Sequence, residues 1–426
     1  MKKSKKRTVS VLLSVLLLSF LLSACGGGKS GGEEGGKSAG PVKLEFWTIS
    51  LQPTFTDYFN KLIADYQKSH EGVTIEWKDY PYDAVTNKLL TSIASGSSPD
   101  VVNLNTEFAS QMGSKGAVVD LNSFLTDEQK QSYFEGIYNS TVIDGKAYAL
   151  PWYTGTEVLF MNTKIVKDAG LDPANPPKTQ DELAAWAKQI KEKTGKSGYA
   201  RQWVSNLFPR EGIKLLNDDK SAAAFNTPET KTILEDIKQK IADGIIVKED
   251  VPFTKQIQYY SSEQVAFEMS GPTFINFLKT SAPDVYKNTI AVPLPTGRSG
   301  VRLSNSMNLV VPAKSKHQKE AVEFAAFVTN AENQTSFAKA ANTLPSTKES
   351  IKDPFFTESD NSLESQAKIT SANSLDKAID YMVGVPNATD INAAIARGLQ
   401  KIMLNDADIN ATLDAMEQEV NQVLKK

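Results

Sequence analysis

The sequence has 426 residues, of which 40% are hydrophobic, 9% aromatic and 23% charged, and a chain of this length and composition predicts two or more globular domains. Cys25 is the only cysteine, which excludes an internal disulfide. With only two histidines, His70 and His317, neither a His- or Cys-built metal site nor a Cys–His nucleophilic pair is expected.

The first 24 residues have the pattern of a signal peptide. A basic start is followed by the apolar run 9–22, which is too short for a comfortable membrane span. The run ends in Leu-Ser-Ala-Cys25, which resembles the bacterial lipobox, in which cleavage precedes a lipidated Cys. The alternative is an ordinary signal peptide with a chance cysteine. Cleavage would remove five positive charges, and the net charge would fall from −3 to −8. An acidic mature chain argues against nucleic acid as a partner.

Residues 25–40 would then form the lipidated Cys and a Gly-rich tether. Acyl chains on Cys25 would hold the protein on a membrane surface without a spanning helix. We therefore expect the folded part to begin near residue 41.

The start of the folded part predicts a parallel α/β sheet. Apolar spacing indicates strands at 43–49, 73–80 and 101–104 and helices at 56–70 and 83–95. In such sheets ligands bind beyond the carboxyl ends of the strands, and these ends are at residues 47–50, 78–81 and 103–107.

Residues 148–162 look like a connection between two lobes. The apolar runs 148–150 and 158–161 predict two strands, and Pro151, two aromatics and a Gly lie between them. Trp152 and Tyr153 offer a broad face with polar tips, and we expect them to face a cleft beside the connection.

The remainder alternates helices and strands. The helix predicted at 179–193 has Thr179 as its N-cap and Glu182 three residues later. Further helices are expected at 228–242, 316–328, 332–340 and 391–424, with a break at 405–408 in the last, and further strands at 265–269, 290–294 and 307–311.

Several stretches in a fixed order resemble the extracellular solute-binding proteins of ABC importers, in the sugar-binding family that includes maltodextrin-binding proteins. The stretches are the lipobox and tether, LEFWT, SGSSPDVVNL, Leu150-Pro151 with VLFMN, KTQDELAAWAKQIKEK, Ser270-Gly-Pro, MNLVVPAKSKHQKEAVEFAAFVTN, LPSTKES and a helical tail. They cover essentially the whole mature chain.

The resemblance implies a type II periplasmic-binding-protein-like fold, with two α/β lobes, three crossings and a ligand cleft between the lobes. Lobe 1 would be 41–154 plus 292–330, and lobe 2 would be 155–291 plus 331–426, with crossings near Thr154, Ala291 and Ala331. It also implies a monomer without a cofactor, anchored on the outer face of a bacterial cell membrane, that captures a sugar and delivers it to an ABC permease.

Sugars bind on aromatic platforms among fixed polar groups. The candidate platforms are Trp47, at the end of the first strand, Trp152 and Tyr153, at the connection, and Trp203, in an irregular aromatic stretch. The alternative for each is packing in the core or at the hinge. Trp186, at helical spacing, and Trp77 are expected in the core.

The candidate hydrogen-bonding residues are Asp83, Asn105, Glu107, Glu157 and Asn308. Asn105 and Glu107 follow the third strand, where the family places ligand contacts. The alternative for Glu107 is charge complementarity with a helix N-terminus, and for Asp83 a helix cap.

One departure concerns the residue after Gly271-Pro272. Many family members have an aromatic there that stacks on the sugar, whereas this chain has Thr273 and then Phe274. Either Phe274 takes that place or the platform is missing.

Other classes of function remain open. Outside the Gly-rich stretch 26–40, which follows no strand and is therefore a poor phosphate loop, no GxSxG, HExxH, Walker A or Rossmann motif is present. Paired carboxylates of a glycosidase are not excluded by spacing alone. A non-sugar solute such as a glycerol phosphate ester would need cations in the cleft, and Arg201, Arg210, Arg298 and Arg302 are the candidates. An adhesion or sensory lipoprotein is the third class.

Overall fold

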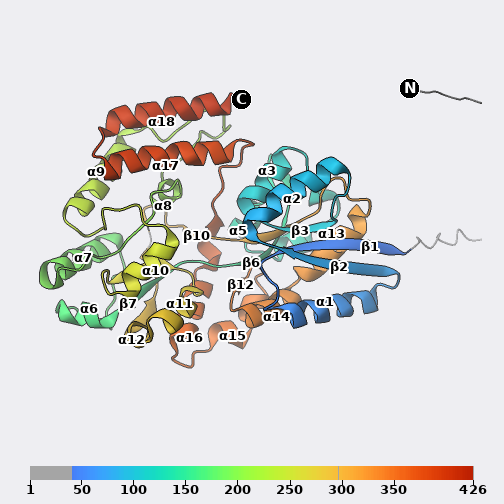
Figure 1. Ribbon diagram of the computed structural model, residues 1–426, viewed down its shortest axis with the longest axis horizontal. Coiled ribbons are helices and arrows are strands. Elements are labelled where there is room, and N and C mark those ends of the chain that lie inside the picture. The colour runs from blue at the N-terminus through green and yellow to red at the C-terminus, as the bar shows by residue number, and fades with distance from the viewer. Residues whose placement is uncertain (1–40, 296, 426) are drawn as a thin grey trace, which may run out of the picture. The chain divides into compact units, whose positions relative to one another are not determined.

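The structure, a computed structural model, describes residues 41–295 and 297–425. The signal peptide, Cys25 and the tether lie outside the described residues, as do the side chains of Tyr82 and Asp83. The described chain forms two main sheets with their helices (Figure 1). No helix in this part of the chain is long and apolar enough to cross a bilayer.

The first sheet has six strands in the order β12-β6-β11-β3-β1-β2. Strand β1 pairs parallel with β2 and β3, which confirms the predicted parallel sheet, whereas β11 runs antiparallel to β3 and β6, and β12 runs antiparallel to β6. The strands are β1 (Val42–Ile49), β2 (Val73–Tyr80), β3 (Val101–Asn105), β6 (Leu150–Thr154), β11 (Met307–Val310) and β12 (Leu344–Pro345).

Helices cover both faces of this sheet. Phe46 of β1 packs with Phe59 in one apolar cluster, and its neighbour Trp47 packs with Val85 and Leu89 in another, because successive strand residues point to opposite faces. The helices around this sheet are α1 (Thr56–Ser69), α2 (Tyr82–Ser95), α3 (Thr106–Ser114), η1 (Leu121–Ser123), α4 (Asp127–Gln131), α5 (Glu135–Asn139), α13 (Gln318–Val328), α14 (Ala331–Ala341), η2 (Ser350–Lys352) and α15 (Pro354–Thr357). A hairpin joins β4 (Val142–Ile143) and β5 (Lys146–Ala147).

The second sheet has the order β8-β7-β9, with β7 (Val158–Asn162) antiparallel to β8 (Phe267–Ser270) and β9 (Thr289–Val292). Parallel bridges from Ser197 to Val265 and from Tyr199 to Ile246 extend it. Its helices are α6 (Thr163–Asp168), α7 (Gln180–Thr194), α8 (Leu207–Arg210), α9 (Pro228–Ala242), α10 (Phe253–Ser261), α11 (Phe274–Ser281), α12 (Pro283–Lys287), α16 (Leu363–Ala372), α17 (Ala388–Leu404) and α18 (Ile409–Leu424).

Several helix features predicted from local signals are confirmed. Thr179 caps α7 in a capping box with Glu182, and α9 has the predicted bounds. Trp186 packs against the core of this lobe, as expected. The predicted break in the C-terminal helix separates α17 from α18.

The strand at the first connection differs from the prediction. We expected a strand at 148–150 and a turn after it, but β6 continues from Leu150 through Pro151, Trp152 and Tyr153. Pro151 fits in this strand because the pairing with β11 shifts register between Met307 and Asn308. The carbonyl of Pro151 accepts hydrogen bonds from Ser346 Oγ at 2.8 Å and from Gln334 Nε2 at 3.1 Å.

Three connections join the two sheets, and the last two differ from the expected positions. The first, 155–157, links β6 to β7. The second ends near Ser306 rather than Ala291, since β10 (Arg302–Ser304) pairs with β13 (Ala378–Asp380) between the sheets. The third follows α15 rather than residue 331, because α14 packs on β6 and β12 pairs with it. A short helix η3 (Leu375–Lys377) precedes β13.

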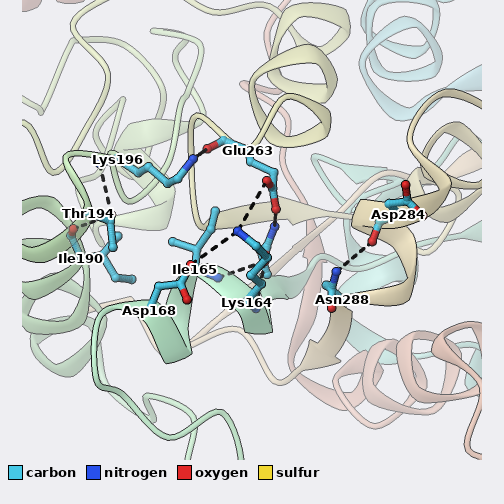
Figure 2. Close-up of polar contacts among 10 residues, drawn as sticks. Lys164, Ile165, Asp168, Ile190, Thr194, Lys196, Glu263, Asp284 and Asn288 are labelled. Atoms are coloured by element: carbon cyan, nitrogen blue, oxygen red, sulfur yellow. Dashed lines mark hydrogen bonds and ion pairs between the residues drawn. The ribbon is translucent and has the colours of Figure 1, made fainter.

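The end of β7 remote from the first connection carries a separate polar cluster around Glu263 (Figure 2). Lys196 Nζ donates to the carbonyl of Glu263 at 2.5 Å, and Asn162 Nδ2 donates to its carboxylate at 3.1 Å. Lys164 forms a longer ion pair with the same carboxylate at 4.0 Å. These contacts join α6 and the end of α7 to the turn before β8. The charges of this cluster are thus paired with one another, and the cluster has a structural role.

Candidate ligand-binding site

The candidate site lies where the second sheet meets the first connection. Val158, the first residue of β7, pairs with Ser270, the last residue of β8. Glu157 and Gly271 therefore leave the sheet at the same end of its strands. The segment around Tyr199 pairs in parallel with the chain at Ile246. The residues that follow Tyr199 therefore reach this end of the sheet too.

A cavity of about 410 Å³, which we call the crossing pocket, opens at this end of the sheet. It is lined by residues of both sheets and of the connections, among them Tyr153, Gly155, Glu157, Phe253, Met269, Gly271 and Asn305. The walls combine aromatic and aliphatic surface with a few polar groups. A concave, largely apolar site of this size with a few polar groups is typical of small-molecule binding.

A second cavity of about 360 Å³, which we call the arginine pocket, lies beside the first and shares Met269 with it. It is lined by Tyr199, Arg201, Arg210, Glu211, Lys240 and Arg298, with Gln180 and Asp181 from the start of α7. Its walls are mostly polar, so it favours charged or strongly hydrogen-bonding groups.

An ion pair belongs to the boundary of the two pockets. Arg210 Nη1 lies 2.8 Å from Glu157 Oε2, and Arg210 Nη2 donates to Glu157 Oε1 at 3.0 Å. This two-bond geometry is the strong form of an arginine–carboxylate contact. Burial opposes the charge of Arg210, but the Glu157 carboxylate outweighs it and raises the pKa of the guanidinium. The pair fixes Glu157, one of the predicted ligand contacts, toward the arginine pocket.

Glu268 of β8 lies close behind this pair. It is 1% exposed, and neither carboxylate oxygen has a hydrogen-bond partner among the described residues. Burial, and then the nearby charge of Glu157, raise the pKa of Glu268 well above its usual value. Both causes disfavour the charged form of this carboxyl group. Within the described residues, no group of three or more His, Cys, Asp or Glu side chains is arranged to hold a metal ion.

A buried polar cluster holds the second connection. Asp380 accepts hydrogen bonds from the Thr106 hydroxyl and, at 2.7 Å, from the backbone N–H of Ser306. Asn308 is fully buried, and its Nδ2 donates to Thr106 Oγ1 at 2.9 Å. Asn308 is thus part of the scaffold of this cluster and has no surface to offer a ligand in this conformation, contrary to our expectation.

The start of α3 carries the predicted polar pair after β3. Asn105 is half-buried and caps α3 by accepting from the N–H of Phe108 at 2.8 Å. Burial raises the pKa of Glu107, and hydrogen bonds from Gln111 and from the backbone of Val383 oppose that rise. Glu107 therefore faces the segment before α17, and we retain both residues as candidate contacts.

The four predicted tryptophan and phenylalanine platforms are in the cores. Trp47, Trp152, Trp203 and Phe274 are each 2% exposed or less. Trp152 stacks on Phe337 at 5.0 Å and lies among Phe46 and Phe59. Our expectation that Trp152 faces the cleft is therefore wrong in this structure, because its strand position turns it to the covered face of the sheet.

The other buried rings also pack in apolar cores. Phe274 begins α11 and packs against Phe160 and Tyr260 in the second lobe, so it does not replace the missing aromatic after Gly-Pro. Trp203 belongs to the other core of that lobe. Trp77 is partly buried and packs against Phe59 at 4.5 Å, as expected. The side chain of Asp83 lies outside the described residues.

Sequence reasoning missed Phe253, which lines the crossing pocket and is 42% exposed. It starts α10, and its spacing to the buried Ile257 and Tyr260 is that of one helix face. That spacing predicts a core residue. The one local signal is Pro252, which places Phe253 in the first turn of α10 and so at the end of the helix.

Comparison with known proteins agrees with this architecture. A solved structure from Synechococcus sp. MITs9220, assigned as an oligosaccharide periplasmic-binding protein, has a TM-score of 0.82 at 29% identity and covers 90% of this chain and 99% of that one. The cyclic alpha-maltosyl-1,6-maltose binding protein from Arthrobacter globiformis has a TM-score of 0.77 at 24% identity, covering 91% and 100%. The chain therefore has the two-lobed type II fold of periplasmic binding proteins.

The sequence comparison defines the family. Residues 52–335 match the model of the bacterial extracellular solute-binding proteins, and the chain belongs to this family, as the resemblance predicted. The arabinooligosaccharide-binding protein of Bacillus subtilis is 26% identical over 323 residues, which are 69% of this chain and 70% of that protein. The protein is thus a solute-binding protein of the ABC-transporter class.

Proposed function

We propose that this protein captures a sugar or an oligosaccharide outside the cell and delivers it to the permease of an ABC importer. The observation that carries the proposal is the crossing pocket, where Tyr153 and the exposed Phe253 lie beside Gly271 and Pro272. Aromatic rings next to open backbone suit the flat C–H faces and hydroxyls of a sugar. Relatives named for oligosaccharide binding support the same ligand class.

Phe253 takes the role of platform in this proposal. No neighbour lies within 4 Å of a Cβ built on Gly271, so the backbone there leaves room for a ligand. Tyr153 stands on β6 and Phe253 on α10, so a sugar between them would contact both lobes. A ligand that bridges the lobes binds the closed arrangement better and shifts the population toward it.

Calorimetry with a panel of mono- and oligosaccharides tests the ligand class, and Phe253→Ala tests the platform. Phe277 is the matched control because it is 46% exposed and its ring lies edge-on to that of Phe253, yet it does not line the pocket. We expect Phe253→Ala to weaken sugar binding by more than about tenfold, which is about 1.4 kcal/mol, and Phe277→Ala to change it little. Equal affinities for the two variants would contradict the platform, and the absence of binding by any saccharide would contradict the function.

Small-angle scattering tests the bridging. The radius of gyration should fall when a saturating sugar is added, and an unchanged radius at saturation would argue against closure. A second measurement is turnover: a product formed from the bound oligosaccharide would contradict a purely binding role and favour an extracellular carbohydrate-active enzyme.

The membrane anchor is the remaining part of the proposal. We assign lipidation to Cys25 and a cell-surface location to the protein on the lipobox pattern of the sequence. Labelling of growing cells with a palmitate analogue should mark the wild-type chain and not Cys25→Ala, which should be found in the medium. Membrane retention of the unlabelled variant would overturn the anchor.

A non-sugar solute is the alternative, and Arg201 favours an anionic one. Its guanidinium lines the arginine pocket without an ion-pair partner among the described residues. Glycerol phosphate esters are the example expected from the sequence, so glycerol 3-phosphate belongs in the calorimetric panel.

A further inference from the structure

Arg201 has a partly buried guanidinium without an ion-pair partner among the described residues. It follows the bridged segment at Tyr199 and lies over two rings, with its guanidinium carbon 6.0 Å from the centre of Tyr199 and 5.7 Å from that of Trp203. Within 41–295 and 297–425 no hydrogen bond or ion pair holds it. Burial lowers its pKa, and the nearby groups of Tyr199, Glu211 and Glu157 oppose that fall only in part.

The other charges of the arginine pocket do not supply that anion. Arg210 already holds Glu157 with two bonds, and Lys240 pairs with Asp236 at 2.7 Å. Glu211 and Asp181 also line the pocket, but among the described residues neither forms an ion pair with Arg201. Arg298, on the loop after β9, adds a further cation to the lining.

An unpaired charge that is partly withdrawn from water costs free energy, and this cost is recovered when a ligand provides the partner. A guanidinium presents its N–H donors as a planar fork that matches the two oxygens of a carboxylate or a phosphate. The faces of Tyr199 and Trp203 hold the fork in place from below, which lowers the entropy lost on binding. The pocket is therefore prepared for one anionic group.

We propose that the arginine pocket binds an acidic oxygen group of the solute through Arg201, so that the captured sugar is an anionic saccharide. The proposal rests on the proposed function, because the sugar ring would occupy the crossing pocket while its acidic group enters the arginine pocket past Met269, which lines both. A uronate carboxylate and a sugar phosphate share the required chemistry.

Calorimetry with matched probes separates these sources. The probes are oligogalacturonides, the same oligosaccharides with their carboxyl groups reduced to alcohols, glucose 6-phosphate and glycerol 3-phosphate. We expect at least one acidic saccharide to bind at least tenfold more tightly than its neutral counterpart. Arg201→Gln should abolish this preference. Arg397→Gln is the matched control, since that arginine pairs with Glu419 on the α17 and α18 helices and lines neither pocket.

Each result decides one proposal. If neutral saccharides bind as well as acidic ones and Arg201→Gln changes nothing, the anionic site is wrong while sugar capture stands. If glycerol 3-phosphate binds through Arg201 and no saccharide binds, the anionic site stands and sugar capture is wrong. A thermal-shift titration of ligand-free protein with inorganic phosphate and with galacturonate is the second readout. The proposal is overturned if no anionic probe raises the Tm of the wild type by more than it raises the Tm of Arg201→Gln.

Discussion

The carboxylate of Asp380 accepts the backbone N–H of Ser306 at 2.7 Å, which fastens the end of β13 to the start of β11. The Asp380 N–H in turn donates to Ser140 Oγ at 3.0 Å, at the end of α5. One buried acid thus links the second connection between the sheets to the chain that follows the third. Its protonation state bears directly on the stability of this junction.

We expect Asp380 to make the protein less stable as the pH rises from about 4 to about 6. Burial raises the pKa of Asp380 from 3.8 to about 6, although the hydrogen bonds from Thr106 and Ser306 oppose this rise. The native state therefore binds a proton that the unfolded state has released in this window, and the free energy of unfolding falls as pH increases. A shift of this size corresponds to roughly 2–3 kcal/mol.

Urea unfolding of the wild type and of Asp380→Asn between pH 4 and pH 7.5 measures this effect. The difference in unfolding free energy between the two proteins should decline through the window and stay level above it. A difference that is constant across the range would contradict a raised pKa for Asp380.

Glu268→Met should stabilise the protein at neutral pH. The substitution keeps the length of the side chain and removes two buried oxygens that have no partner among the described residues. Removal of unsatisfied buried polar groups gains on the order of 1–3 kcal/mol. Thermal unfolding at pH 7.5 measures the gain, with the exposed Glu229→Met as the control for length and charge; a Tm below that of the wild type would show that Glu268 has a stabilising partner.

Trp152→Ala should destabilise the fold by roughly 3–5 kcal/mol, because it empties a site among Phe46, Phe59 and Phe337. Trp152→Phe should cost less, since Nε1 of the indole has no hydrogen-bond partner to lose among the described residues. Denaturant unfolding gives both values. Wild-type stability of Trp152→Ala together with lost sugar binding would instead identify the indole as a ligand platform.

Gly136→Ala should destabilise the protein, by roughly 1–3 kcal/mol, although alanine is the better helix residue. A Cβ at Gly136 would lie 2.2 Å from the carbonyl oxygen of Ala378, which is backbone of β13 and cannot turn away. Gly155→Ala is the control, because no atom lies within 4 Å of its Cβ position and its φ is not positive. If both variants have the Tm of the wild type, α5 and β13 do not pack as closely as described.

The elements with local signals could be predicted from the sequence. The bounds of α9, the Thr179 cap of α7 and the break between α17 and α18 follow from capping residues and apolar spacing, which act within a few residues. The family and its fold were also accessible, because an ordered set of short stretches runs along most of the chain.

The candidate site was only partly predictable. Tyr153 and Glu157 line the crossing pocket, and their contact with a ligand stays a prediction. Phe253 and the burial of Trp152 were not accessible, because spacing along one element does not say which face another element covers. The displacement of the third connection has the same origin, since it is defined by the pairing of β12 with β6.

The sequence by itself determined the class of this protein: the helices and strands with local signals, its two-lobed fold and its family. These depend on residue order and on interactions among near neighbours. Only the tertiary structure decided which aromatic ring is exposed at the crossing and which arginine of the arginine pocket pairs with a carboxylate. Burial and pairing are properties of residues brought together from distant parts of the chain, as Arg201, Arg210 and Met269 are in the arginine pocket.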